Sequence, residues 1–257
     1  MQKKQLQALT LEQKCALLSG ATTFGTRALP KNNIPSITLS DGPNGVRKQA
    51  GAADHLGLNP SVPATCFPTA ATVACSWDPA LGEQIGQAMG EEAAAQEVAV
   101  LLGPGLNTKR SPQHFAVNSQ ELRRMASDSV VDERTLRELY LTGFEIVVKE
   151  AKPKTIMSSY NLINGTYANE NRHLLMDILR GEWSFDGAVV TDWGGSNDHA
   201  LGVQNGSTLE MPAPGGDAVR ELMQAVQSGK ITEADVDARL DELLTLVFDT
   251  HAAVQSH

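Results

Sequence analysis

The stretch FDGAVVTDWGGS, residues 185–196, decides how the rest of the chain is interpreted. Its residues 188–191 are apolar without alternation, which is typical of a strand covered on both faces in a parallel sheet. This strand is expected to end at Asp192, which is followed by Trp193 and a Gly-Gly turn. Carboxylates at the C-terminal ends of parallel strands stand where α/β barrels and open α/β sheets carry their chemistry. Asp192 is therefore a candidate catalytic nucleophile, and the competing interpretation is that it only caps the next helix.

Segments on both sides repeat this order of strand, loop and helix. The expected strands comprise residues 34–40, 98–103, 155–160, 188–191 and 207–211. Most of them end in a polar residue followed by glycine or proline. The expected helices comprise residues 5–19, 80–96, 133–149, 172–181, 219–226 and 233–247. No repeat of fixed period and no low-complexity linker divides the chain. We therefore expect one α/β domain over residues 1–257 that is a TIM-barrel-like (β/α) domain, with an open parallel sheet as the alternative.

One connection is too short for this pattern. Only about ten residues separate the expected strand 98–103 from the segment at His114, fewer than a βα crossover with its helix needs. If both segments are strands of one sheet, a helix is missing between them, and the barrel is incomplete or modified by the loss of one repeat. Uncovered strand edges and helix flanks favour self-association, so a homo-oligomer is expected.

Composition argues against several classes of partner and location. Hydrophobic content of 41%, charged content of 20% and a net charge of −9 describe a globular protein that binds neither nucleic acid nor an anionic membrane. No apolar run approaches the roughly 18 residues of a membrane span, and the basic N-terminus lacks the apolar core of a signal peptide. The three cysteines lack zinc spacing and are expected to be reduced and buried in a cytoplasmic protein. No nucleotide loop or pair of metal ligands is recognised, so no cofactor and no metal is expected.

Six motifs together resemble one known family. They are SDGPNGVR at residues 40–47, LGPGLN at 102–107, HFAVN at 114–118, DER at 132–134, MSSYN at 157–161 and TDW at 191–193. In this order, over nearly the whole chain, they resemble the N-terminal barrel domain of glycoside hydrolase family 3, the β-glucosidase family. The resemblance implies retaining hydrolysis of small β-glucosides, with a glycoside as the small-molecule partner.

The resemblance also assigns roles to seven side chains. Asp192 matches the nucleophile that forms the glycosyl-enzyme intermediate. Asp41 matches an aspartate that accepts hydrogen bonds from sugar hydroxyls, although its segment taken alone is more typical of a plain turn. The remaining matches are to sugar-binding or pocket-lining positions: His114, Arg124, Met157, Tyr160 and Trp193. Two alternatives stay open beside these matches: a core histidine for His114, and a surface ion-pair residue for Arg124.

Three features depart from the family pattern. A sugar-binding turn with its arginine, and one βα unit, are absent between Pro112 and Gln113, and Gln113 replaces the family's lysine. The family's usual glutamate acid/base lies in a following domain, which we expect to be absent. Charged donors contribute roughly 1.5–3 kcal/mol each and leaving-group protonation about 10²–10⁴-fold, so weak activity is predicted. Four side chains are candidate substitutes for the acid/base, with no choice among them: Glu170, Asp198, His199 and Glu210.

Two functions of different classes follow from these observations. The leading hypothesis is a β-glucosidase-like hydrolase that works best on aryl glucosides, whose leaving groups need little protonation. The alternative is a sugar-binding pseudoenzyme, or an inactive truncated scaffold that lacks the family's acid/base domain. A barrel lyase or aldolase requires a lysine at a strand end, and none of the expected strands ends in one.

Overall fold

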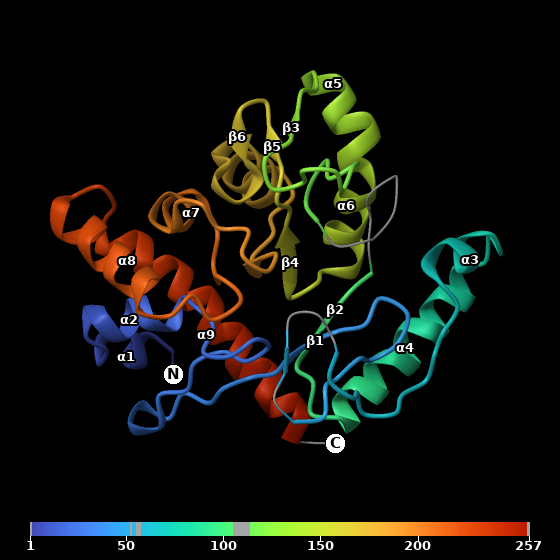
Figure 1. Ribbon diagram of the computed structural model, residues 1–257, viewed down its shortest axis with the longest axis horizontal. Coiled ribbons are helices and arrows are strands. Elements are labelled where there is room, and N and C mark those ends of the chain that lie inside the picture. The colour runs from blue at the N-terminus through green and yellow to red at the C-terminus, as the bar shows by residue number, and fades with distance from the viewer. Residues whose placement is uncertain (1, 52, 55–57, 105–113, 256–257) are drawn as a thin grey trace.

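Pairs of parallel strands lie at the centre of the fold, with the longer helices outside them (Figure 1). The computed structural model describes residues 2–51, 53–54, 58–104 and 114–255. The strands are β1 (Leu39–Asp41), β2 (Val100–Leu102), β3 (Asp128–Ser129), β4 (Thr155–Ser158), β5 (Leu162–Ile163), β6 (Thr166–Tyr167) and β7 (Ala188–Thr191). The regular helices are α1 (Gln2–Gln7), α2 (Leu11–Leu17), α3 (Ala70–Ala74), α4 (Pro79–Ala95), α7 (His199–Asn205), α8 (Gly216–Ser228) and α9 (Glu233–Gln255).

Two further helical segments contain wider turns. The first runs without a break through α5 (Glu133–Thr135), η2 (Leu136–Leu141), α6 (Thr142–Ile146) and η3 (Val147–Ala151). The second is η5 (His173–Glu182). The chain also contains two single helical turns, η1 (Pro30–Asn32) and η4 (Ala168–Glu170). The helix expected at residues 133–149 is thus confirmed, but Leu139, expected on its apolar face, is 57% exposed. The irregular turns place Leu136, Leu141 and Phe144 in the core instead.

The parallel strands form two arcs. Strand β4 pairs with β7 along its whole length, and β1 pairs with β2. Single-residue parallel bridges widen the first arc: Phe115 to Ser158, Val190 to Leu209 and Ser19 to Glu210. Among the described residues, no backbone pairing joins β2 to the parallel bridge at Phe115. The two arcs share one hydrophobic cluster, because Leu39, Val100 and Leu102 of one arc pack with Met157 and Val190 of the other.

The predicted parallel α/β arrangement is confirmed, with two qualifications. The strand expected at residues 207–211 is reduced to the bridges at Leu209 and Glu210. The junction at which one βα unit was judged missing, together with Gln113, lies outside the described residues.

Strand β7 stands between the two largest hydrophobic clusters. Ala188 and Val190 belong to the cluster that includes the buried faces of α8 and α9, whereas Val189 belongs to the cluster around Phe115 and η5. Alternate residues of a strand point to opposite sides, so each side of β7 faces one cluster. All four β7 residues are buried, which confirms the prediction of a strand covered on both faces.

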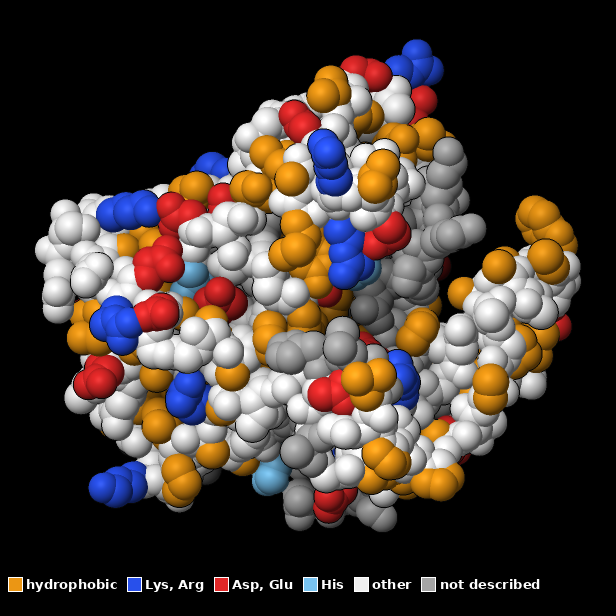
Figure 2. All heavy atoms as spheres, viewed as in Figure 1, with side chains coloured by type: hydrophobic (Ala, Val, Ile, Leu, Met, Phe, Trp, Pro, Cys, Tyr) orange, Lys and Arg blue, Asp and Glu red, His pale blue; other side chains and the backbone are white. Residues whose placement is uncertain are grey.

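Helix starts follow the capping signals of the sequence, but α4 does not pack as expected. Asp78 caps α4 by accepting a hydrogen bond from the backbone N–H of Ala80 at 2.9 Å, with Pro79 at the first helical position. The expected apolar face of α4 is largely uncovered, because only Ala93 is buried and Leu81 is 37% exposed. Helices α3 and α4 project from one side of the fold, and Figure 2 shows hydrophobic side chains along them.

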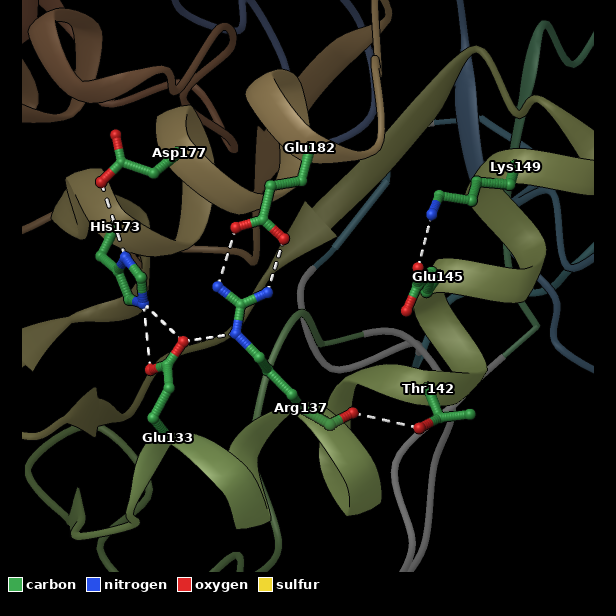
Figure 3. A network of polar contacts seen from close by, with 8 residues as sticks. All are labelled: Glu133, Arg137, Thr142, Glu145, Lys149, His173, Asp177 and Glu182. Carbon is green, nitrogen blue, oxygen red and sulfur yellow. Dashed lines mark hydrogen bonds and ion pairs between the residues drawn. The ribbon is translucent and has the colours of Figure 1, made fainter.

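A surface network ties the α5–η2 segment to η5 (Figure 3). Arg137 donates through Nη1 and Nη2 to the two carboxylate oxygens of Glu182 and through Nε to Glu133. His173 lies between Glu133 and Asp177, so both helical segments contribute to the network. These groups are about one-third to one-half exposed, so their contribution to stability is small.

A second charged cluster is buried. Glu242 of α9 accepts from Arg180 of η5 and from Arg239, each at 2.9 Å, and from the Thr208 hydroxyl at 2.6 Å. The side chains of Arg180, Arg239 and Glu242 are no more than 13% exposed. Removing one member of such a cluster leaves an unpaired buried charge, so the cluster fixes α9 against η5.

The expectation for the cysteines is only partly correct. Cys15 is buried, and burial raises the pKa of its thiol to about 11. Cys66 and Cys75 are exposed, contrary to prediction, because they lie in the loop before α3 and at its end, away from the core. All three are free thiols. In the described part of the chain, no helix has the length and apolar character needed to cross a membrane.

Candidate active site

One cavity of about 430 Å³ brings together all seven side chains selected from the sequence. Its lining residues are Phe24, Asp41, His114, Arg124, Met157, Tyr160, Asp192 and Trp193. Asp41 ends β1, Met157 lies in β4, and Asp192 follows β7. Parallel strands deliver their C-terminal ends to one edge, so residues more than 150 positions apart in the chain meet there.

Asp192 lies at the centre of this polar surface. Its Oδ1 accepts a hydrogen bond from the backbone N–H of Trp193 at 2.7 Å, and its Oδ2 lies 2.6 Å from Nε2 of His114. Helix α7 is capped by Asp198, whose Oδ1 accepts from the backbone N–H of Leu201 at 2.9 Å. The interpretation of Asp192 as a helix cap is therefore wrong, and its carboxylate lines the cavity.

The Gly-Gly turn after Asp192 allows Tyr160 to pack closely. A side chain at Gly195 would place its Cβ 3.3 Å from the Tyr160 ring and 3.1 Å from the carbonyl oxygen of Asp192. Gly194 has φ of +80°, a conformation that other residues rarely adopt. The Tyr160 hydroxyl donates to the carbonyl oxygen of Trp193 at 2.8 Å. Burial, and then the nearby Asp192 carboxylate, raise the pKa of Tyr160, so its hydroxyl remains a neutral donor.

An aromatic wall stands beside these polar groups. Trp193 donates through Nε1 to the carbonyl oxygen of Thr23 at 2.7 Å, and its ring centroid lies 5.3 Å from that of Phe24. Flat aromatic surfaces of this kind suit the apolar face of a sugar ring. Phe24 could not be selected from the sequence, because a phenylalanine in an irregular segment without a motif does not indicate a site.

Asp41 combines the two roles that the sequence left open. Its carbonyl oxygen accepts from the backbone N–H of Arg47 at 2.8 Å and so closes a turn, while its side chain lines the cavity. Burial raises the pKa of this carboxyl, Arg47 opposes that effect, and Asp192 adds to it. Two carboxyl groups thus line one cavity, and burial is the main reason why the pKa of Asp41 is raised.

Arg124 also belongs both to an ion pair and to the cavity. Its Nη1 donates to Oε2 of Glu121 at 2.9 Å, and its guanidinium carbon lies 4.4 Å from the Tyr160 ring centroid. With 40% of its side chain exposed, Arg124 also lines the cavity. The surface ion-pair interpretation is correct but incomplete.

The four candidate substitutes for the acid/base lie around α7 and do not line this cavity. Glu170 accepts from the backbone N–H groups of Asn197 and Asp198 at 3.1 and 2.8 Å. Asp198 caps α7, while His199 and Glu210 lie side by side in the interior. Each therefore has a structural role behind the segment that follows Asp192. The described residues contain no group of three His, Cys, Asp or Glu side chains that could hold a metal ion.

Known proteins are similar to this chain over nearly its whole length. The family model "Glycosyl hydrolase family 3 N terminal domain" matches residues 113–246, more than half of the chain. Thermostable beta-glucosidase B of Acetivibrio thermocellus is 43% identical over 282 positions, which cover 96% of this chain and 37% of that protein. An exo-alpha-(1->6)-L-arabinopyranosidase of Bifidobacterium longum is 40% identical, again over 96% of this chain and 37% of that protein.

Solved structures are also similar to this chain over nearly its whole length. The beta-glucosidase of Kluyveromyces marxianus, solved in complex with glucose, superposes with a TM-score of 0.91 at 31% identity. That match covers 99% of this chain and 34% of the Kluyveromyces protein. The chain thus spans little more than a third of the length of these relatives. On the match to its family model and the placement of its motifs, the chain belongs to glycoside hydrolase family 3.

Proposed function

We propose that this chain carries the nucleophile and the principal sugar subsite of a retaining β-glycosidase, with small β-glucosides as substrates. The observation that carries the proposal is the position of Asp192, whose carboxylate faces a cavity that also contains Asp41, His114 and Tyr160. β-Glucosidases among the relatives support glucosides as the substrate class. The arabinopyranosidase relative is consistent with the same site accepting another six-membered sugar ring.

The first chemical step assigns a role to each group. A carboxylate oxygen of Asp192 attacks the anomeric carbon, and the bond from that carbon to the aglycone oxygen breaks with its electron pair leaving on the aglycone. Asp41 and Arg124 hold sugar hydroxyls, and the aromatic wall of Trp193 supports the sugar ring. Water then attacks the anomeric carbon and gives one proton to the solvent, while the bond from that carbon to Asp192 breaks; this releases the sugar and regenerates the Asp192 carboxylate.

Protonation of the leaving group limits the choice of aglycone. A retaining mechanism uses a second carboxyl group about 5 Å from the nucleophile. Among the described cavity residues the second carboxyl group is Asp41, which we assign to sugar hydroxyls. We therefore expect aryl glucosides, whose aryloxide leaves without a proton, to react far faster than alkyl glucosides, since a general acid contributes about 10²–10⁴-fold.

We also propose that the chain forms one (β/α) domain that lacks about one βα unit. The alignment with the Acetivibrio protein spans 282 positions, more than the 257 residues of this chain. The relative therefore has additional residues within the matched region. Their number is comparable to the roughly 30 residues of a βαβ unit.

Trapping of the intermediate tests the nucleophile directly. The protein is incubated with a 2-fluoro β-glucoside bearing a dinitrophenyl leaving group, and its intact mass and peptides are measured. We expect one added fluoroglucosyl group on the peptide that contains Asp192, and none on Asp192→Asn. Labelling of another residue, or equal labelling of the variant, would reject the assignment.

A sugar-binding pseudoenzyme is the second candidate function. The lack of a further carboxyl group among the described cavity residues favours it. Calorimetric titration with glucose distinguishes the two functions. Binding without either labelling or turnover of an aryl glucoside supports the pseudoenzyme, whereas turnover that Asp192→Asn abolishes supports the hydrolase.

A further inference from the structure

A chain of polar contacts leads from the surface to Asp192. Arg124 donates to Oε2 of Glu121 at 2.9 Å, and the other oxygen of Glu121 lies 3.3 Å from Nδ2 of Asn118. The same Nδ2 lies 3.2 Å from Nδ1 of His114, whose Nε2 is 2.6 Å from Oδ2 of Asp192. Asn118 and His114 are 4% and 8% exposed, so solvent competes little for the inner contacts.

In this series of contacts, each hydrogen bond has only one possible donor and one possible acceptor. The Glu121 carboxylate, paired with Arg124, can only accept hydrogen bonds, so the Asn118 atom that faces it must be the NH₂ group. That group then donates its other hydrogen to Nδ1 of His114. Nδ1 must present a lone pair, and a neutral imidazole therefore carries its single proton on Nε2, facing Asp192.

We infer that Asn118 is a positioning residue: its amide, oriented by Glu121, keeps a lone pair on Nδ1 of His114 and the ring proton on Nε2, which faces Oδ2 of Asp192. The carboxylate then accepts from the backbone N–H of Trp193 through Oδ1, while Nε2 of His114 lies 2.6 Å from its Oδ2. Two fixed neighbours thus restrain its orientation.

The catalytic consequence rests on the proposed role of Asp192 as the nucleophile. A carboxylate held in a fixed orientation is suited to attack an anomeric carbon. Neither Asn118 nor Glu121 lines the cavity, so both act through His114 and Arg124 rather than through the sugar.

The tautomer can be measured whether or not the protein is an enzyme. Two-bond ¹H–¹⁵N spectra of ¹⁵N-histidine-labelled protein distinguish the two neutral tautomers from the imidazolium ion. The signal of His114 among the six histidines is identified by its loss in His114→Gln. At about pH 7 we expect the Nε2–H pattern for His114. An Nδ1–H or doubly protonated ring in the unsubstituted protein would overturn the inference.

Asn118→Asp tests the cause. A carboxylate at this position accepts instead of donating, so Nδ1 of His114 should gain a proton in the spectrum. We expect the rate of fluoroglucosyl labelling to fall at least about tenfold, while glucose affinity changes less than about threefold. Gln120→Glu, which adds the same charge on an exposed side chain of the same segment, should change neither tautomer nor rate. An unchanged His114 pattern in Asn118→Asp would refute the role of Asn118, whereas absence of labelling in the unsubstituted protein would refute only the proposed function.

Discussion

Replacing Glu210 with glutamine is predicted to stabilise the folded chain above pH 7. The Glu210 side chain is 13% exposed, and its Oε2 lies 3.4 Å from Nδ1 of the fully buried His199. Burial raises the pKa of Glu210 to about 7, the carboxylate of Glu221 adds to this effect, and Ser196 opposes it. The folded protein therefore keeps a proton on Glu210 at a pH where an exposed glutamate has lost it.

The magnitude follows from this difference between the folded and unfolded states. The unfolded chain releases the Glu210 proton near its ordinary pKa of 4.5, whereas the folded chain releases it near 7. The contribution of Glu210 to the free energy of unfolding is fully present below about pH 4.5 and is lost as the pH rises through 7. Each pKa unit corresponds to about 1.4 kcal/mol, so the loss amounts to roughly 3 kcal/mol. Glutamine avoids it because an amide does not ionise.

His199 titrates in the opposite sense. Burial lowers the pKa of His199 from 6.5 to about 4, so the unfolded chain binds its proton first. Its contribution to stability is present above pH 6.5 and is lost as the pH falls through 4. To first order this loss is shared by both proteins, so the difference between them reports Glu210.

Urea unfolding followed by tryptophan fluorescence measures this difference. At about pH 4.5 the free energies of unfolding of Glu210→Gln and the unsubstituted protein should agree within about 1 kcal/mol. At about pH 8.5 the variant should be more stable by roughly 3 kcal/mol. Glu83→Gln, at an exposed position of α4, is the control and should shift neither value. A difference that does not depend on pH, or a less stable variant at high pH, would refute the reasoning.

Three further predictions concern the turn, the buried charges and the uncovered helix. Gly195→Ala should slow fluoroglucosyl labelling of Asp192 at least about tenfold, because the added Cβ meets the Tyr160 ring. Gly194→Ala should instead lower the free energy of unfolding by only about 1–2 kcal/mol, because φ at this position is +80°. Glu242→Ala should lower the free energy of unfolding by roughly 3–5 kcal/mol, since it leaves two buried arginines unpaired; a urea midpoint close to that of the unsubstituted protein would contradict this. Light scattering should show a concentration-dependent oligomer that Leu81→Glu on α4 dissociates, and a monomer at all concentrations would exclude self-association.

The sequence was informative where structure depends on local chemistry. A buried apolar run followed by Asp192 located β7 and its C-terminal end, because a strand covered on both faces has a recognisable composition. Asp78 followed by proline located the start of α4 for an equally local reason. The seven cavity residues depended on the family resemblance as well, since spacing in the sequence does not determine that Asp41 and Asp192 meet.

Non-local packing was not predictable from the sequence. The apolar spacing of α4 correctly indicated a helix, but no pattern within the helix shows that Leu81 lacks a neighbour to cover it. Exposure of Cys66 has the same origin, because burial of a single cysteine depends on the path of distant segments. The contacts of Asn118 lie within the motif HFAVN, yet the direction of its amide follows only from the position of Glu121.

The segment after β7 is restrained from behind by groups that do not enter the cavity. The Thr191 hydroxyl accepts from the backbone N–H of Met211 at 2.8 Å, and Gly194 donates to the carbonyl oxygen of Met211 at the same distance. Glu170 holds the backbone of residues 197 and 198 in the same way. The Glu170 carboxylate is therefore occupied in holding the segment that follows Asp192, and its use as a general acid would release that restraint. Since none of the four candidates around α7 lines the cavity, we expect the proton donor for the proposed nucleophile Asp192 to reach the cavity from elsewhere.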